Sequence, residues 1–274
     1  MTPVREACEV LGYRRAGAYH ALTLVAPGIA EAARPGQFVE LLAGEDRSFL
    51  LRRPFSIHRV ERAGAALGAV EVVFDVVGPG TRALALLRPH DLVDALGPLG
   101  RPFTPPPAPV RCLLVGGGYG TAALFFLAEE LRARRCRVDF AVGAATAGRL
   151  FDAMGAKRLG HTLTVTTDDG SAGQRGLVTD PLPALLARLG TGQVYACGPM
   201  PMLAAVSQVA AEHGVPCQVA VEELMACGTG VCFSCVVPVT DPEAPDAPAR
   251  MARSCLEGPV FDGTAVAWAE LVAP

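Results

Sequence analysis

The residues best suited to chemistry are four cysteines near the C-terminus. Three fall within CGTGVCFSC, residues 227–235, separated by four and then two residues, and the fourth follows in RSCLEGPVF. This is the ligand spacing of plant-type [2Fe–2S] clusters, in which thiolates from one loop converge on two irons. Gly228 and Gly230 permit the positive φ angles and the close backbone approach that such a loop needs. The predicted ligands are Cys227, Cys232, Cys235 and Cys255.

Two alternatives remain for this cysteine set. Structural zinc also takes four cysteines, but usually as two short pairs, and here only Cys232 and Cys235 form such a pair. The other alternative is a set of unrelated buried thiols. The spacing favours the cluster over both. The remaining cysteines lie in apolar or strand-like contexts and are expected to be small core residues: Cys8, Cys112, Cys136, Cys197 and Cys217.

A glycine-rich segment, VGGGYGTAAL at residues 115–124, follows a predicted strand and opens a predicted helix. Gly118, Gly120 and Ala123 fit the G-x-G-x-x-A turn, in which backbone N–H groups approach a pyrophosphate. An ordinary glycine turn is the alternative, and the surrounding α/β pattern favours nucleotide binding. The expected ribose-binding acid is not obvious: Asp139 lies inside the next strand, and Arg149 could suit a 2′-phosphate. NAD and NADP both remain open.

Two segments of the N-terminal part, LRRPFSI (51–57) and VVGPGTRAL (76–84), could hold a flavin nucleotide. An arginine beside Ser56 at a strand start could bind a phosphate bidentately, while the hydroxyl reaches a flavin ring. From the residues alone, both segments are better explained as ordinary turns.

The chain of 274 residues is long enough for two or three domains. Short β-rich segments predict an antiparallel barrel or sandwich for residues 1–103, and the proline run RPFTPPPAPV (101–110) marks a boundary. Alternating strands and helices predict a parallel-sheet α/β domain over 108–217. The short, glycine-rich remainder, 218–274, is too small to bury much apolar area alone and needs something else to hold it together.

Composition excludes several classes of protein. With 51% apolar and 19% charged residues, the chain is expected to fold into a packed core. A net charge of −3 gives no basic field for nucleic acid or an anionic membrane. The N-terminus does not look like a signal peptide, so we expect a cytoplasmic protein, and the uncharged segment 112–128 is too short and glycine-rich to span a membrane. The five histidines are scattered and are expected to be structural.

Taken together, the motifs resemble a known family. RPFSI, GPGT, GGGYG, DDGSAGQRGLVTD, YACGPMPML and VEELMACGTGVCFSC with CLEGPVF are similar to the electron-transfer subunit of NAD-linked dihydroorotate dehydrogenase, a ferredoxin-reductase-like flavoprotein. The resemblance covers nearly the whole chain. It implies an FAD-binding β-barrel (1–103), an NAD-binding α/β domain (108–217) and a [2Fe–2S] domain (218–274).

The resemblance also implies roles for individual residues. Ser56 and Cys197 would be the catalytic positions, beside the flavin ring and the nicotinamide respectively. The implied FAD contacts are Arg53, Pro54, Phe55, Ser56, Gly78, Gly80 and Thr81. The implied NAD contacts are Gly117, Gly118, Gly120, Cys197, Gly198 and Pro199. The sequence departs from the family at Ala123, where a proline is usual.

The implied function is electron transfer between NAD and an FMN-containing dihydroorotate dehydrogenase catalytic subunit, in a heterotetramer of two copies of each chain. One alternative is the flavin and iron–sulfur subunit of a related ferredoxin:NADP or sulfide-linked oxidoreductase. An alternative from a different class is a non-catalytic binding module held together by zinc.

Overall fold

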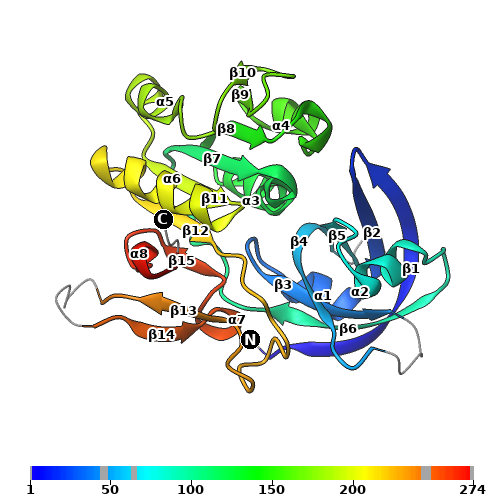
Figure 1. The fold of residues 1–274 in the computed structure, drawn as a ribbon. Coiled ribbons are helices and arrows are strands. Elements are labelled where there is room, and N and C mark those ends of the chain that lie inside the picture. The colour runs from blue at the N-terminus through cyan, green and yellow to red at the C-terminus, as the bar shows by residue number, and fades with distance from the viewer. Residues whose placement is uncertain (1, 44–48, 63–66, 242–247, 272–274) are drawn as a thin grey trace.

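The computed structural model describes residues 2–43, 49–62, 67–241 and 248–271. Figure 1 shows a β-barrel beside a layered α/β unit, with a small hairpin below the α/β sheet. This arrangement confirms the predicted combination of an N-terminal antiparallel barrel, a nucleotide-binding type of α/β fold and a small C-terminal unit.

The barrel closes in the strand order β1-β2-β5-β4-β3-β6, with every neighbouring pair antiparallel. Two short helices, α1 (Pro27–Ala32) and α2 (Pro79–Ala85), connect strands. Side chains alternate between the two faces of each strand, so Val39 and Leu41 of β3 enter the barrel core while Phe38 and Glu40 face outward. The strands are β1 (Val4–Ala16), β2 (Tyr19–Val25), β3 (Phe38–Ala43), β4 (Arg53–Glu61), β5 (Ala69–Phe74) and β6 (Leu92–Leu99).

The α/β unit is a seven-stranded sheet in the order β10-β9-β8-β7-β11-β12-β15. The strands are β7 (Arg111–Gly117), β8 (Arg137–Ala144), β9 (Thr162–Thr167), β10 (Gln174–Arg175), β11 (Gln193–Cys197), β12 (Cys217–Ala220) and β15 (Val260–Asp262). The first six pair in parallel, as the strand–helix alternation predicts, and β15 adds an antiparallel edge.

Helices cover both faces of this sheet (Figure 1). α3 (Thr121–Ala133) and α4 (Ala153–Leu159) pack on one face, and α5 (Leu182–Leu189) and α6 (Met200–Glu212) on the other. Each face therefore has its own apolar core, because a parallel sheet must be buried on both sides. None of the helices in the described ranges is long and apolar enough to cross a bilayer.

The C-terminal unit contains a two-stranded hairpin, β13 (Val236–Val239) with β14 (Arg250–Arg253), and two short helices, α7 (Ser254–Glu257) and α8 (Trp268–Leu271). The predicted boundary between residues 217 and 218 falls at the start of β12. The proline-rich segment at the predicted boundary is hydrogen-bonded to both units. The Phe103 N–H donates to the Pro35 carbonyl of the barrel unit at 2.8 Å, and the Thr104 N–H donates to Gln218 Oε1 of β12 at 2.8 Å.

His58 of β4 joins the barrel to α3. Its ring is 1% exposed, and Nδ1 donates to the Ala122 carbonyl at 2.6 Å. Burial lowers the pKa of His58 to about 4, against the Ala122 carbonyl and the Glu71 carboxylate, which favour the charged ring. Arg59 and Arg14 act in the same direction as burial.

This histidine predicts acid sensitivity of the joint between barrel and α/β unit. The pKa of His58 in the folded protein lies below the ordinary 6.5. The stabilisation that the neutral His58 ring provides is therefore fully present above pH 6.5 and is lost as the pH falls toward 4. At pH 4.5 the loss should be about 2 to 3 kcal/mol. When the pH is lowered from 7 to 4.5, the unfolding temperature should fall less in His58→Gln than in the native chain. Equal falls in the two proteins would contradict this role of His58.

Candidate functional site

The cysteine segment, residues 221–235, leaves β12 and forms a tight loop. Gly228 and Gly230 have φ angles of 64° and 81°, the left-handed region that glycine adopts at low cost. Phe233, at φ 58°, is a non-glycine residue in the same region. The loop packs on α7: a Cβ at Gly230 would overlap the Leu256 side chain. Glycine is thus favoured here by the backbone conformation.

The four predicted cysteine ligands occupy this segment and the neighbouring α7. Cys232 is exposed at the loop tip, Cys227 is half-buried, and Cys235 and Cys255 are 2% and 0% exposed. They form two contacting side-chain pairs, Cys227 with Cys232 and Cys235 with Cys255. Within the described ranges, no three His, Cys, Asp or Glu side chains are arranged as a metal-binding group.

Backbone donors surround the Cys227 sulfur. Burial raises the pKa of this thiol, but hydrogen bonds from the Cys232 and Thr229 backbone N–H groups and from the side chains of the same two residues outweigh it and lower the pKa to about 6. Burial raises the pKa of Cys255 to about 12, and its partner Cys235 adds to this rise. Four thiols on one loop and its packed helix, with N–H groups turned toward a sulfur, suit an iron–sulfur cluster.

The buried cysteine pair lies directly on the outer face of the barrel. Cys235 and Cys255 share one apolar cluster with Phe38 of β3 and Leu99 of β6. Phe38 pairs with Ser56 across the β3–β4 ladder, so both side chains lie on the same barrel face. The cysteine segment and the predicted flavin-binding strand are therefore neighbours.

The predicted FAD-phosphate residues come together where β4 starts. A Cβ at Gly80 in α2 would meet Arg53 Nε at 2.7 Å, so the guanidinium lies against this turn. Arg53 also donates from Nη1 to the Leu51 carbonyl at 2.6 Å. The Thr81 hydroxyl accepts from the Gly78 N–H at 3.1 Å and from the Val77 N–H at 3.0 Å. Thr81 thus stabilises its own turn, while Arg53 and Gly80 form the surface beside it.

The other predicted flavin-contact residues of β4 lie on different faces of the strand. Ser56 is exposed on the outer face and Pro54 is half-buried, whereas the Phe55 ring enters the barrel core, 5.3 Å from the Phe74 ring centre. Neighbouring residues of a strand point to opposite faces. Only the backbone of Phe55 is therefore available on the face that carries Ser56.

The predicted coenzyme turns pack against each other at the ends of β7 and β11, which are adjacent parallel strands. A Cβ at Gly120 would meet Gly198 Cα at 2.8 Å and the Cys197 carbonyl oxygen at 2.9 Å. A Cβ at Gly117 would meet Pro199 Cδ at 2.9 Å. Both turns need glycine for this backbone contact. The structure thus brings all six predicted NAD-contact residues to one sheet edge.

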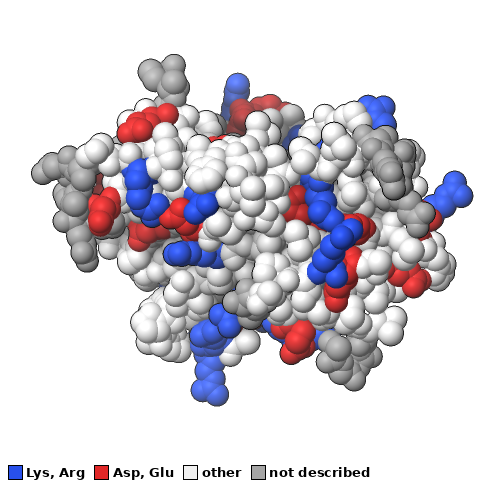
Figure 2. Space-filling view, turned by 90° about the horizontal axis from the view of Figure 1, so that it is seen from below, with Lys and Arg blue, Asp and Glu red and all other residues white. Residues whose placement is uncertain are grey.

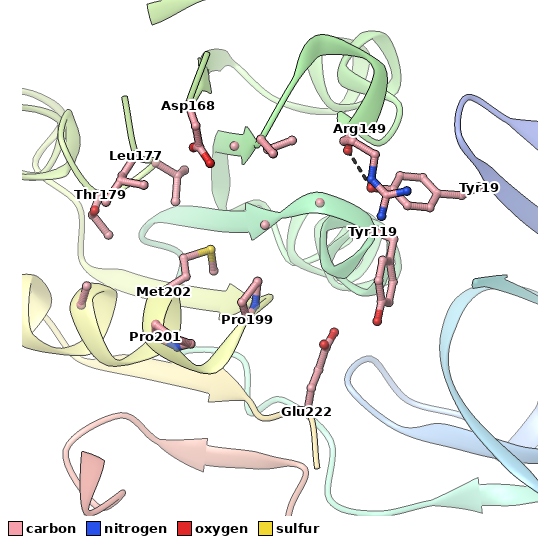
Figure 3. A pocket seen from close by; sticks show the side chains of 17 residues that line it. Tyr19, Tyr119, Arg149, Asp168, Leu177, Thr179, Pro199, Pro201, Met202 and Glu222 are labelled. Carbon is pink, nitrogen blue, oxygen red and sulfur yellow. Dashed lines mark hydrogen bonds between the residues drawn. The ribbon is translucent and has the colours of Figure 1, made fainter. Parts of the chain in front are cut away.

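A cavity of about 460 Å³ opens at this edge. Gly117, Gly118 and Pro199 line it, together with residues from β8, α6, the barrel and the segment that follows β9, as Figure 3 shows. Its size suits a small-molecule site. The Ala123 departure has no visible effect on the wall: α3 begins at Thr121, and Ala123 is buried in its first turn.

Two residues missed by the sequence analysis, Tyr119 and Glu222, face each other across the cavity floor (Figure 3). Glu222 is accessible to solvent in the cavity, yet the protein packed around it raises its pKa. Burial, followed by the Glu222 charge, raises the pKa of the Tyr119 phenol to about 12 and that of the Cys197 thiol far above its usual range. Cys197 is 2% exposed and stays protonated at neutral pH. Glu222 lies two residues beyond the end of β12, but no spacing in the sequence marks it.

The two charged residues considered for coenzyme selection have different places. Asp139 is 0% exposed and is held by Arg111 and by Thr162, whose hydroxyl donates to Oδ1 at 2.6 Å, so it is a core residue. Arg149 lines the cavity and forms an ion pair with Asp75 of the barrel. Asp168, at the end of β9, also lines the cavity and was not predicted as a site residue.

A second cleft, of about 530 Å³, separates the start of β4 from the segment that leads to Cys227. Exposed apolar side chains flank it and the loop tip: Leu224 is 86% exposed, Val231 79% and Phe233 59%. Seen from below, the molecule shows wide uncharged areas with interspersed charges of both signs (Figure 2). Clustered exposed apolar side chains such as Leu224, Val231 and Phe233 are typical of a protein contact.

Comparison with solved structures defines the class of the protein. The NADH-dependent reduced ferredoxin-NADP oxidoreductase, studied for flavin-based electron bifurcation, is 31% identical with a TM-score of 0.82, covering 97% of this chain and 91% of that one. A ferredoxin NADP+ reductase from Neisseria gonorrhoeae shares the fold at 18% identity, with a TM-score of 0.61 over 77% and 92% of the two chains. The fold is that of a ferredoxin-reductase-like oxidoreductase.

Curated sequences then give the family. The dihydroorotate dehydrogenase B (NAD(+)) electron transfer subunit of Desulforamulus reducens is 37% identical over 98% of this chain and 100% of its own length. The subunit of the same description from Geobacillus thermodenitrificans is 37% identical over 94% and 96%. Residues 222–267 match the iron-sulfur cluster binding domain of dihydroorotate dehydrogenase B. The chain belongs to the family of dihydroorotate dehydrogenase B electron transfer subunits, which confirms the resemblance.

Proposed function

We propose that this chain carries electrons between NAD and the FMN-containing catalytic subunit of a dihydroorotate dehydrogenase, by way of FAD and a [2Fe–2S] cluster. One observation carries the proposal: Phe38, which is paired with Ser56 in the β3–β4 ladder, packs against Cys235 and Cys255. The coenzyme cavity, the flavin-binding strand and the cysteine segment would then be successive electron-transfer sites on one molecule.

The chain's own residues have distinct tasks in this proposal. Arg53 and the turn at Gly80 would hold the FAD phosphates, and Ser56 would present its hydroxyl to the ring. The backbone at Gly117, Gly118 and Gly120 would bind the NAD pyrophosphate. FAD, when bound, exchanges a hydride with NAD and single electrons with the cluster.

The floor of the cavity would control protons and water around the nicotinamide. Cys197 would contribute a neutral thiol beside the ring, because its pKa is raised by burial. Glu222, whose pKa is raised by burial, lies opposite Tyr119 on the cavity floor. We infer that Glu222 orients the nicotinamide amide by hydrogen bonding.

We further propose that the partner docks over the loop tip. Cys232 is exposed there, and Leu224, Val231 and Phe233 surround it with apolar area that a partner would cover. Two copies of each chain would form a heterotetramer, as the family resemblance implies. Nine free cysteines suit a reducing cytoplasm.

A second candidate is the corresponding subunit of a ferredoxin:NAD(P) oxidoreductase. The full-length likeness to the ferredoxin-NADP oxidoreductase, at 31% identity, favours it as the alternative. The two functions differ in the partner and not in the cofactors.

The test is purification from the native source without air, followed by identification of the second chain. We expect a brown-yellow complex that contains iron and flavin but little zinc, and that reduces NAD+ with dihydroorotate only when both subunits are present. A complex with a different redox partner, or full dihydroorotate oxidation by this chain alone, would refute the proposed division of labour. A colourless zinc protein would instead indicate the binding module.

A further inference from the structure

The coenzyme cavity is lined by charged side chains of both signs. Among the described residues that line it, Arg149 is the one cation, and Asp168 and Glu222 are the carboxylates. The cation is already paired with Asp75, a barrel residue just beyond β5 that does not line the cavity. We propose that Asp75 selects NAD(H) over NADP(H) by holding Arg149 where it cannot bind a 2′-phosphate. This inference rests on the proposed use of the cavity as the coenzyme site.

The sheet order locates the adenosine end of the coenzyme. The glycine turn follows β7, and β8 and β9 lie next to it in that order. In dinucleotide-binding folds, the ribose 2′ position is recognised near the end of the strand beside the glycine turn. In this chain that strand ends at Ala144 and is followed by Ala145, and the methyl side chains of these two residues cannot recognise a hydroxyl or a phosphate.

The two charged residues beside this strand end are therefore the candidates for recognition. The Asp168 N–H donates to the Ala144 carbonyl at 3.1 Å, which fixes Asp168 next to it. Arg149 follows β8 in the short helical turn Ala147–Arg149. Figure 3 shows Asp168 and Arg149 on opposite sides of the strand end. An unpaired Arg149 would compensate a 2′-phosphate there, whereas Asp168 would repel it and accept a hydrogen bond from a 2′-hydroxyl.

Three contacts hold Arg149 toward the barrel. Its Nη2 lies 2.7 Å from Asp75 Oδ2, and its guanidinium carbon lies 4.9 Å from the centre of the Tyr19 ring. Its backbone carbonyl accepts a hydrogen bond from the Tyr19 hydroxyl at 2.8 Å, as Figure 3 also shows. The ion pair neutralises the charge, and the ring contact fixes its direction. A 2′-phosphate would have to compete with Asp75 for the same guanidinium.

The decisive variant is Asp75→Asn. Asparagine keeps the acceptor that Asp75 Oδ1 offers to the Val76 N–H at 2.8 Å, but it removes the charge that holds Arg149. We expect the ratio of the NADP+ to the NAD+ dissociation constant, measured by calorimetry on the flavin-loaded chain, to fall about tenfold, as for one charge-assisted hydrogen bond. Asp75→Ser serves if the asparagine variant loses its flavin.

Two further variants show whether the effect passes through Arg149. In the double variant Asp75→Asn with Arg149→Gln, the ratio should return to the native value, because no cation is left to release. Glu130→Gln is the matched control. Glu130 of α3 pairs with Arg134, with 2.9 Å between Oε1 and Nη2, and neither residue lines the cavity. Removing this carboxylate should leave the ratio unchanged. A gain in NADP+ affinity that persists in the double variant would overturn the proposal.

A blocking variant separates this inference from the proposed coenzyme site. Ala205 of α6 lines the cavity, and Ala205→Trp should fill it and weaken both coenzymes. If Ala205→Trp binds NAD+ as the native chain does, the cavity is not the coenzyme site and both proposals fail. If it loses both coenzymes while Asp75→Asn leaves the ratio unchanged, only the role of Asp75 is refuted.

Discussion

Cys232→Ala should remove the iron–sulfur absorption and slow electron transfer to the catalytic subunit by more than about 100-fold, since even indirect changes around a metal site cost 10- to 100-fold. Cys232 lies exposed at the loop tip, so its loss deletes a ligand without opening a cavity in the core. The FAD content should remain at the native level, because the proposed FAD residues lie on β4 and α2. Iron analysis, the visible spectrum and reduction of the partner would measure the effect.

The chain provides a matched control for this experiment. Cys136 is a buried thiol, 5% exposed, that lies before β8 and outside the predicted ligand set. Cys136→Ala should keep native iron content and native electron transfer, at the cost of some stability. Native iron content in Cys232→Ala would show that the cluster, if present, uses other ligands.

The second large effect is expected at the flavin. Arg53→Ala should weaken FAD binding about 10- to 100-fold, the range for losing a charge-assisted hydrogen bond to phosphate. Arg53→Lys should recover part of the affinity, because lysine keeps the charge but not the planar fork. The measurements are the flavin-to-protein ratio after purification and fluorescence titration of the FAD-free chain.

The neighbouring arginine is the control for Arg53. Arg52 bonds to Asp94, with 2.8 Å between Nη2 and Oδ2, whereas Arg53 lies against the turn at Gly80. Arg52→Ala should therefore leave FAD affinity within about threefold of native. Equal flavin loss in both variants would mean that the start of β4 acts only as a scaffold.

Local patterns explain what could be predicted from the sequence. Cysteine spacing and the glycine turn are recognisable because their chemistry depends on residues close together in the chain. The barrel and the α/β alternation follow from strand length and turn residues, and the fold confirms both. The edge strand β15 escaped prediction because three residues carry no measurable periodicity.

The missing parts of the site depend on contacts between distant segments. Glu222 faces Tyr119 only because β12 and β7 lie on either side of β11 in the sheet. Arg149 meets Asp75 across the barrel and the α/β unit, at a separation of 74 residues. The direction of the Phe55 ring follows from strand alternation once the barrel core is known. The spacing of residues along the chain does not predict these contacts.

The part of the chain that carries the four predicted cysteine ligands leaves the seven-stranded sheet and rejoins it at one pair of neighbouring residues. Ala220 of β12 is directly opposite Val260 of β15, so the described residues 221–241 and 248–259 lie between two neighbouring positions of the seven-stranded sheet. Just beyond this pair, the Val221 N–H donates to the Pro259 carbonyl at 2.9 Å, and Cys235 and Cys255 pack against Phe38 and Leu99 of the barrel. In the electron relay that we propose, the distance between the flavin and the cluster would therefore be fixed by the fold and would stay constant through each turnover.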